Sequence, residues 1–429
     1  MSEEKLVPKL RFLEFTKVWK STKIGEIADI VGGGTPRTEV EEYWDGEIKW
    51  FTPSEIGKTK YIFDSKRHIT DKGLKNSSAK LLPKDTILLS SRATVGEISI
   101  ALTECSTNQG FQSLITKNNV DNDFIYYLIS TIKNEFLRRS SGSTFLEISK
   151  NEIKRIPINI PELSEQNKIS NLFSAIDNKI EMLEKKHQYY QDFKKYLMQR
   201  IFSSQDDKLR FADDENWVTV TIANIFDNIT DYVAAGSFAD IRKNVTYLKD
   251  PDYAQLIRTA DLKSNFTNGD FVYVDKHAFE YLWRVNLDEP CIVLPNIGNI
   301  GEVYYINPKE LPYSNNALAP NAILLKSNDN IKFKYYLLES PYFKNQLDII
   351  NEAGGRGKFN KTNLKKIKIK VPNNDLEKEK IAKCLSNVDN KLKLFNIQLI
   401  EMQEFKKGLL QQMFVVQLIL SLLQNKKHI

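Results

Sequence analysis

The sequence predicts an α+β protein built as a tandem repeat, in which two domains are separated by two long antiparallel helices that form a coiled-coil spacer with pseudo-twofold symmetry. Three observations predict this architecture. One stretch of 38 residues occurs twice, each copy carries a helical apolar seam, and the strand pattern before each copy is also repeated. At 429 residues, the chain also exceeds what one hydrophobic core usually supports.

The duplicated stretch runs from Glu165 to Phe202 and again from Glu377 to Phe414, and an offset of 212 residues aligns the copies without a gap. Of the 38 positions, 14 are identical, including an Asp-Asn-Lys and a Phe-Lys-Lys triplet. Neither copy has an interior Gly or Pro, apart from Gly408 near the end of the second. At a rise of about 1.5 Å per residue, each predicted helix is roughly 55 Å long.

Apolar residues in each copy recur at steps of three and four, as expected for a helix that pairs with another helix. His187 lies on this seam, where a polar residue can fix the register of pairing. Lys194 and its counterpart Lys406 either extend outward at the edge of the seam or contact an acidic partner. The predicted seam residues are Ile169, Phe173, Ile176, Ile180, Leu183, Tyr190, Leu197, Ile381, Leu385, Val388, Leu392, Phe395, Leu399, Met402 and Leu409.

The strand pattern before each long helix is also duplicated. Two apolar runs joined by a polar loop predict paired strands at 86–89 and 95–101 in the first half, and at 291–294 and 300–306 in the second. A helical segment follows in each half, and a strand of alternating apolar residues, ended by a proline, leads into the long helix. We therefore expect an α+β domain before each long helix.

These patterns divide the chain into a first domain (1–162), a first spacer helix (163–204), a second domain (205–373), a second spacer helix (374–415) and an atypical apolar tail (416–429). The apolar run of the tail is far shorter than the ~20 residues that span a bilayer. The charged first ten residues do not resemble a signal peptide. We therefore expect a cytoplasmic protein without membrane contact.

Composition and motifs indicate binding rather than catalysis. The net charge of +6 and pI near 8.8 are weakly in favour of a polyanion partner. Cys105, Cys291 and Cys384 are too far apart for a disulfide framework, and the four histidines lack metal-ligand spacing, so we expect no metal. The segment 57–59, Gly-Lys-Thr, lacks the upstream glycine of a phosphate-binding loop, and no Asp/Asn-Pro-Pro-Tyr segment for base methylation occurs.

With these residues in view, three motifs carry a family resemblance: GGGTP at 32–36, SRATVGE at 91–97 and IPINIPELSEQNKI at 156–169. Together with the tandem repeat, they make the sequence resemble the specificity subunit of Type I restriction-modification systems. The second copy departs from this pattern, with Glu377-Lys378 in place of Glu165-Gln166 and no counterpart of GGGTP. The resemblance implies two target-recognition domains, each reading half of a split sequence in double-stranded DNA.

The resemblance also implies partners. Two modification subunits would bind S-adenosylmethionine and methylate adenine, and two restriction subunits would use ATP and Mg²⁺. The present subunit would be non-catalytic, would need no cofactor, and would supply the DNA address for both reactions.

We expect loops, rather than the helical seam, to contact base edges and phosphates. The glycine-flanked cations in 354–358 are the strongest candidates, because glycine lets the backbone approach a phosphate closely. The predicted contacts are Thr35, Arg37, Arg92, Thr94, Arg138, Arg139, Ser143 and Thr144 in the first domain, and Arg242, Lys243, Arg258, Asn299, Arg356, Lys358 and Lys361 in the second.

Tryptophan can serve a nucleic-acid site by stacking on bases, but its large apolar side chain more often fills a core. We therefore expect Trp44, Trp50 and Trp283 to be buried. Base contacts would then fall to the polar loops.

Two other classes of function stay open at the sequence level. The chain could be a non-catalytic coiled-coil interaction scaffold or an RNA-binding adaptor with an incidental basic charge, and a lack of salt-dependent duplex binding would favour this class. A self-sufficient nuclease has support only from scattered carboxylates near lysine, at 47–49 and 152–154.

Overall fold

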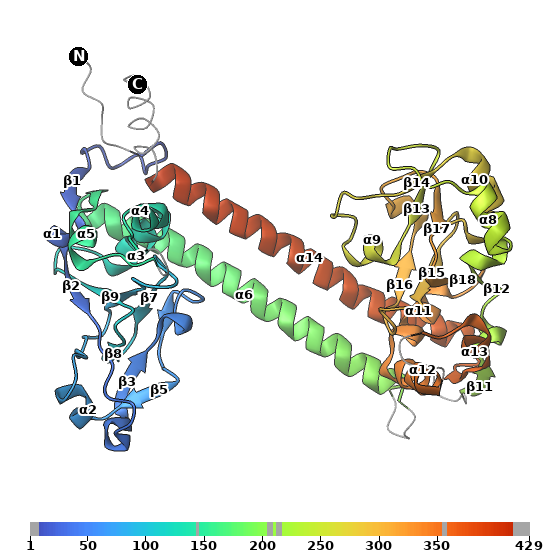
Figure 1. Cartoon of the computed structure of the whole chain (residues 1–429), viewed down its shortest axis with the longest axis horizontal. Helices are drawn as coiled ribbons and strands as arrows, with labels where there is room; N and C mark the ends of the chain where they lie inside the picture. The colour runs from blue at the N-terminus through green and yellow to red at the C-terminus, as the bar shows by residue number, and fades with distance from the viewer. Residues whose placement is uncertain (1–7, 143–145, 204–208, 212–216, 354–357, 415–429) are drawn as a thin grey trace, which may run out of the picture. The chain divides into compact units, whose positions relative to one another are not determined.

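The computed structural model describes residues 8–142, 146–203, 209–211, 217–353 and 358–414 (Figure 1). The chain forms two compact units. Unit 1 comprises 1–184 and 397–429, and unit 2 comprises 185–396. Each unit contains one α+β domain and one half of each long helix, α6 (Leu163–Ile201) and α14 (Asp375–Phe414). The predicted apolar tail and the predicted contacts Ser143, Thr144 and Arg356 lie outside the described residues.

Unit 1 is built on a five-stranded sheet with the order β2-β9-β6-β7-β4, in which only β7 and β4 pair parallel. The antiparallel pair β6 and β7 corresponds to the two predicted apolar runs. Smaller sheets, β5-β3-β8 and β1-β10, complete the unit. The strands are β1 (Lys20–Lys23), β2 (Ala28–Gly32), β3 (Trp44–Phe51), β4 (Tyr61–Ile62), β5 (Arg67–Ile69), β6 (Ile87–Leu89), β7 (Ile98–Ala101), β8 (Cys105–Thr107), β9 (Gln112–Thr116) and β10 (Pro157–Ile160).

Short helices pack on these sheets, and side chains cap their first turns. The Asp121 carboxylate accepts a hydrogen bond from the Phe124 backbone N–H (2.6 Å) at the start of α3, and the Ser149 hydroxyl accepts one from Glu152 at the start of α5. The main core joins the five-stranded sheet to α3 through buried residues such as Leu89. The helices are α1 (Ile24–Ile27), η1 (Glu41–Tyr43), η2 (Pro53–Glu55), α2 (Asp71–Lys75), α3 (Asn122–Thr131), α4 (Lys133–Arg138) and α5 (Lys150–Arg155).

Unit 2 repeats this plan with a four-stranded sheet of order β12-β18-β15-β16 and smaller sheets β14-β13-β17 and β11-β19. Each unit has one parallel strand pair in its three-stranded sheet, β3 with β8 and β13 with β17. The strands are β11 (Val218–Thr221), β12 (Asn228–Asp231), β13 (Ala254–Ile257), β14 (Tyr273–Val274), β15 (Cys291–Pro295), β16 (Tyr304–Ile306), β17 (Asn316–Leu318), β18 (Ala322–Lys326) and β19 (Lys368–Val371).

The helices of unit 2 cover the same sheets, and two separate cores lie on the two sides of β15. Ile292 and Leu294 point into one core and Cys291 and Val293 into the other, as alternation along a strand requires. The helices are α7 (Ile222–Ile225), η3 (Tyr232–Ala235), α8 (Phe238–Asn244), α9 (Thr259–Lys263), α10 (Lys276–Tyr281), η4 (Trp283–Val285), η5 (Pro308–Glu310), α11 (Ile331–Glu339), α12 (Pro341–Ala353) and α13 (Lys361–Lys366).

The long helices run antiparallel within each unit. In unit 1, Phe173 of α6 packs on Phe414 of α14 with ring centroids 5.8 Å apart. Asp177, one turn after Phe173 on α6, pairs with Lys406, two turns before Phe414 on α14. Moving forward along one helix therefore means moving backward along the other. None of the fifteen predicted seam residues is exposed. Buried residues are Ile169, Phe173, Ile176, Leu183, Leu197, Ile381, Leu385 and Val388, and half-buried residues are Ile180, Tyr190, Leu392, Phe395, Leu399, Met402 and Leu409.

One core prediction is wrong. Trp44 and Trp50 are buried and pack edge to face, but the Trp283 side chain is 64% exposed. Its short helix η4 directs Leu282 and Val285, three residues apart, into the core. Trp283 follows Leu282 directly and therefore points outward.

Candidate nucleic-acid interface

The exposed loop between β6 and β7 of unit 1 is held by backbone contacts to two other segments. The Ser91 N–H donates to the Gly110 carbonyl (2.8 Å), and the Ile148 N–H donates to the Ser91 carbonyl (3.0 Å). The next residue, Arg92, forms an isolated bridge with Glu147. Two neighbouring segments therefore clamp the loop and hold Arg92 at an exposed position.

The loop between β15 and β16 of unit 2 has the same backbone frame. The Asn296 N–H donates to the Asn321 carbonyl (3.1 Å), and the Phe359 N–H donates to the Asn296 carbonyl (3.1 Å). Ile297 bridges Lys358 as Arg92 bridges Glu147 in unit 1. The backbone contacts of the loop are therefore the same in both units, whereas the side chains that the loop carries differ.

Backbone angles support this correspondence. Ala93 and Gly298 follow the bridged residue and have φ of 63° and 84°, and Gly96 and Gly301 have φ of 88° and 91°. Positive φ is uncommon for a residue with a Cβ, so Ala93 shows that the turn is imposed by its surroundings. Both loops therefore adopt the same turn, with a residue of positive φ at the same two positions.

The triple glycine of unit 1 lies beside this loop. A Cβ on Gly33 would lie 2.1 Å from the Asn108 carbonyl oxygen, and one on Gly34 would lie 2.2 Å from the Ser78 hydroxyl. Only glycine fits this close approach. The chain then presents Thr35, whose hydroxyl donates to the Gln109 side chain, next to Gly110 and hence next to the loop of Arg92.

The other predicted contacts of unit 1 are less closely grouped. Arg37 is exposed, and its carbonyl accepts a hydrogen bond from the Trp44 indole (3.1 Å). Thr94 is exposed in the loop of Arg92. Arg138 and Arg139 end α4 and pair with Glu135, and Arg139 also pairs with Glu152 (3.5 Å).

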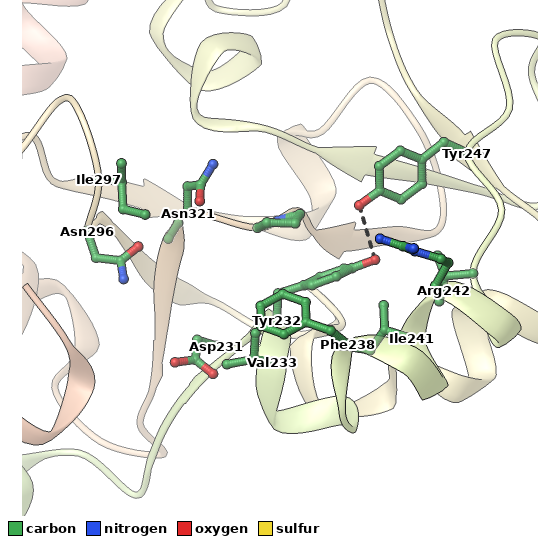
Figure 2. Close-up of a pocket in the computed structure, with 13 residues that line it drawn as sticks. Asp231, Tyr232, Val233, Phe238, Ile241, Arg242, Tyr247, Asn296, Ile297 and Asn321 are labelled. Atoms are coloured by element: carbon green, nitrogen blue, oxygen red, sulfur yellow. Dashed lines mark hydrogen bonds between the residues drawn. The ribbon is translucent and has the colours of Figure 1, made fainter. Parts of the chain in front are cut away.

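In unit 2, Arg242 and Lys243 are exposed on α8. Arg242 lines a cavity of about 590 Å³ that the Asn296–Ile297 turn also borders. Figure 2 shows Asn296, Ile297 and Asn321 on one side of this cavity and Arg242 and Tyr247 on the other. The Tyr247 hydroxyl donates to the Tyr232 hydroxyl (3.2 Å), and burial raises the pKa of Tyr232. Arg242 and the loop therefore line the same cavity.

Two of the remaining predicted cations of unit 2, Lys361 and Arg258, pair with carboxylates. Lys361 pairs with Asp231 (2.9 Å) at the edge of the same cavity, and Lys358 is exposed beside Ile297. Arg258 donates to the buried carboxylate of Asp261 (2.7 Å), a bond that raises the pKa of Arg258. The predicted contact Asn299 is half-buried, and its side chain accepts a hydrogen bond from Lys263 (3.4 Å).

Sequence reasoning missed Ile297, Glu147 and the cavity-lining Phe238 and Tyr247, because cations and hydroxyls are the side chains that most often contact DNA. The matched turns could have pointed to Ile297, since SRATVGE aligns with NIGNIGE when the glycines at 96 and 301 are superposed. No sequence signal brings Glu147 to Arg92, because the pairing depends on an isolated bridge between distant segments.

A second pair of matched clusters ties each domain to its long helices. In unit 1, the Tyr127 hydroxyl donates to Asp177 (2.6 Å), which also pairs with Lys406 (2.5 Å). Burial and the bond to Asp177 raise the pKa of Tyr127. Lys406 of the seam therefore has an acidic partner within the chain. The same holds for Lys194 in unit 2, which pairs with two carboxylates.

In unit 2, the Tyr336 hydroxyl donates to Asp389 (2.7 Å), and Lys194 pairs with both Asp389 (2.9 Å) and Glu339 (3.0 Å). Burial lowers the pKa of Lys194, but the two carboxylates outweigh this effect and raise it above its ordinary value. Burial also raises the pKa of Tyr336.

Outside the seam, the long helices carry exposed apolar side chains. On α6, Tyr189 and Phe193 stack with ring centroids 6.3 Å apart and are 65% and 37% exposed. Exposed apolar stripes mark interaction surfaces on soluble proteins. Further exposed apolar residues on the two long helices are Tyr196, Leu376 and Leu394 in unit 2, and Leu163, Met182, Ile397, Ile400 and Phe405 in unit 1.

Within the described ranges, no group of three or more His, Cys, Asp or Glu side chains is placed to hold a metal ion. In the same part of the chain, no helix has both the length and the apolar character needed to cross a membrane.

Comparison with known proteins identifies the family. The profile of the Type I restriction modification DNA specificity domain matches residues 16–189 and again 214–402. The chain therefore belongs to this family and contains the domain twice.

Individual relatives support the same family assignment. The MjaIX specificity subunit of a Type I restriction enzyme from Methanocaldococcus jannaschii is 40% identical over 176 residues, which cover 40% of this chain and 41% of that protein. The EcoR124I/EcoR124II specificity subunit from Escherichia coli is 27% identical over 43% of this chain and 49% of its own length. These matches thus span less than half of either relative, whereas the M. jannaschii MjaVIII specificity subunit matches over 91% of both chains at 21% identity.

Among solved structures, the S subunit of a Type-I restriction-modification system from M. genitalium superposes with a TM-score of 0.58 at 19% identity. The match covers 95% of this chain and 99% of that one. The tandem fold is therefore that of S subunits, as the duplicated sequence predicts.

Proposed function

We propose that this chain is the DNA-recognition subunit of a Type I restriction-modification complex, in which each unit reads one half of a bipartite target. The observation that carries this proposal is the duplicated loop frame. The frame holds Arg92 with Glu147 in unit 1 and Ile297 with Lys358 in unit 2. Two readers of different half-sites need one scaffold and two sets of contacting side chains.

The cations around these loops would contact phosphates. Arg138, Arg139 and Lys361 lie in ion pairs that are partly exposed to solvent. Such pairs contribute little to stability, so a phosphate can replace the carboxylate at small cost. Thr35, Arg37, Thr94, Arg242 and Lys243 would add further contacts to phosphates or base edges.

The long helices would set the gap between the half-sites. DNA half-sites lying roughly one helical turn, about 34 Å, apart suit two readers joined by a rigid spacer. The seam residues make each helix pair a packed unit rather than a loose linker, because none of them is exposed. The number of base pairs between the two half-sites would then depend on the length of the helices.

Catalysis would belong to partners in the cytoplasm. Two modification subunits would bind S-adenosylmethionine and methylate adenine, two restriction subunits would use ATP and Mg²⁺, and this chain would need no cofactor of its own. The exposed aromatic side chains of α6 in unit 2, Tyr189, Phe193 and Tyr196, suit a helix of such a partner. The comparisons give no support to an interaction scaffold or an RNA-binding adaptor.

Adenine methylation tests the proposal directly. Methylated adenines are mapped across the genome of the host, with and without the gene for this chain. We expect one split sequence to lose its methylation when the gene is absent. Purified chain with its modification subunits should bind that sequence with an affinity that falls steeply with salt. An unchanged methylation map would contradict the proposal.

A further inference from the structure

The two loop tips present different chemistry at one backbone position. Arg92 and Ile297 are both the residue after the clamped Ser91 or Asn296 and before a left-handed residue. Both residues are exposed to solvent. Position and exposure are thus matched, and what differs is the group that a bound duplex would meet.

In unit 1, the guanidinium of Arg92 is oriented by Glu147. The Arg92 Nε and Nη2 atoms both donate to Glu147 Oε2, at 3.1 and 2.5 Å. Three of the five N–H donors, two on Nη1 and one on Nη2, are left at the far end of the planar group. Guanine presents two acceptors, O6 and N7, in the major groove, and arginine binds them with two such donors. A carboxylate that fixes the plane reduces the entropy lost on binding.

In unit 2, the tip has no hydrogen-bond donor in its side chain. Ile297 lines the 590 Å³ cavity, which is also lined by Val233, Phe238 and Tyr247, residues that are 44%, 79% and 52% exposed. The thymine C5-methyl is the apolar group on a base edge in the major groove. The isoleucine tip itself therefore suits thymine and offers no donor to the two acceptors of guanine, while Arg242, the cation of this cavity, lies on its opposite side (Figure 2).

We propose that this tip position selects the base in each half-site, with Arg92 reading a guanine and Ile297 reading a thymine through its methyl group. The proposal rests on the proposed DNA-recognition function and adds the chemical identity of one base in each half. Glu147 acts as a positioning residue for Arg92. Lys358, the counterpart of Glu147, is exposed and would contact a phosphate next to the thymine.

Base analogues test this selection in the complete complex with modification subunits, on the target found by methylation mapping. Replacing the guanine with 7-deazaguanine removes N7, and replacing the thymine with deoxyuridine removes the methyl group. We expect the first change to weaken binding about tenfold. The second should weaken it about fourfold, since a buried CH₂-sized group contributes about that factor.

Variants assign each effect to a tip. Arg92→Ala should abolish the response to 7-deazaguanine in one half-site and keep the response to deoxyuridine in the other, and Ile297→Ala should do the reverse. Arg92→Lys keeps the charge but loses the planar fork, so it should also lose the guanine preference. Glu147→Gln should weaken that preference without removing it.

The outcomes separate the two proposals. A complex that binds its target specifically but keeps both analogue responses in the variants overturns the tip assignment alone, as does a half-site without guanine or without thymine. If the aromatic lining of the unit 2 cavity serves a protein partner, Phe238→Ala changes complex assembly while the deoxyuridine response persists, which also overturns it. A complex with no sequence-specific DNA binding overturns the proposed function instead.

Discussion

Single residues explain why the duplicated helices keep their register. Asp177 and Asp389 are equivalent in the two copies, and each receives a tyrosine hydroxyl from its domain and a lysine from the opposite long helix. Buried or half-buried polar groups on a helical seam favour one alignment over its neighbours, because any shift leaves them unpaired.

Tyr336→Phe should destabilise unit 2 by about 1–3 kcal/mol, because it removes a buried donor from the Asp389 carboxylate. Tyr189→Phe is the matched control, since Tyr189 is 65% exposed on α6, and it should change stability by less than about 0.5 kcal/mol. Urea unfolding measures both. Equal effects of the two changes would show that the hydroxyl bond does not stabilise the unit.

The Lys194 ion pairs predict a response to alkaline pH. The pKa of Lys194 is raised above its ordinary value of 10.5, so the folded chain holds this proton more tightly than the unfolded chain. Its stabilisation is complete below that value and is lost as pH rises through the raised pKa. Between pH ~9 and pH ~12, the free energy of unfolding should therefore fall less steeply in Lys194→Met than in the wild type. Parallel curves would contradict the assignment.

At this scale the sequence predicts little beyond residue type. Lys194 and Lys406 could be placed on the seam, but their carboxylate partners lie on another helix or domain and could not be read from spacing. Trp283 was assigned to the core on size, and the local turn reversed that prediction. Arg258 looks like any loop cation in the sequence, yet it neutralises the buried Asp261. Contact of the predicted residues with DNA stays a prediction.

Helices and strands are easier to predict than single contacts, because the period of their apolar residues repeats over many positions. The heptad pattern predicted α6 and α14, and the paired apolar runs predicted β6 with β7 and β15 with β16. Short elements such as η4 and the bridge at Glu147 leave no such period. The cavity of unit 2 could not be predicted at all, because its lining comes from four separate segments.

The seam makes a testable distinction between two leucines of α14. Leu385 is fully buried and Leu394 is 45% exposed on the same helix. Leu385→Ala should cost about 2–5 kcal/mol of stability, and Leu394→Ala less than about 0.5 kcal/mol. Urea unfolding of both variants, with circular dichroism to follow helix content, compares them directly. Similar losses would mean that the two faces of α14 do not differ in packing.

For the whole molecule, the exposed stripe predicts where partners bind. Phe193→Asp places a charge on the exposed aromatic stripe of α6, where Phe193 stacks on Tyr189 and meets the half-buried seam residue Tyr190 edge to face. It should leave the fold intact and weaken assembly with the modification subunits by tenfold or more, an order-of-magnitude estimate for an interface anchor. Lys195→Asp, at an exposed position nearby, is the control for charge alone. Equal affinities of the wild type and Phe193→Asp in a binding titration would exclude the stripe as a docking surface.

In the proposed function, two readers address one DNA molecule at a separation set by the long helices. Inserting seven residues after His187 in α6 and seven after Ile397 in α14 keeps the seam in phase and lengthens each helix by about 10 Å. Mapping methylated adenines with this variant in place of the wild type is the most direct test. We expect both half-sites to be retained and the gap between them to grow by about three base pairs. Methylation of the original sequence with its original gap would contradict it.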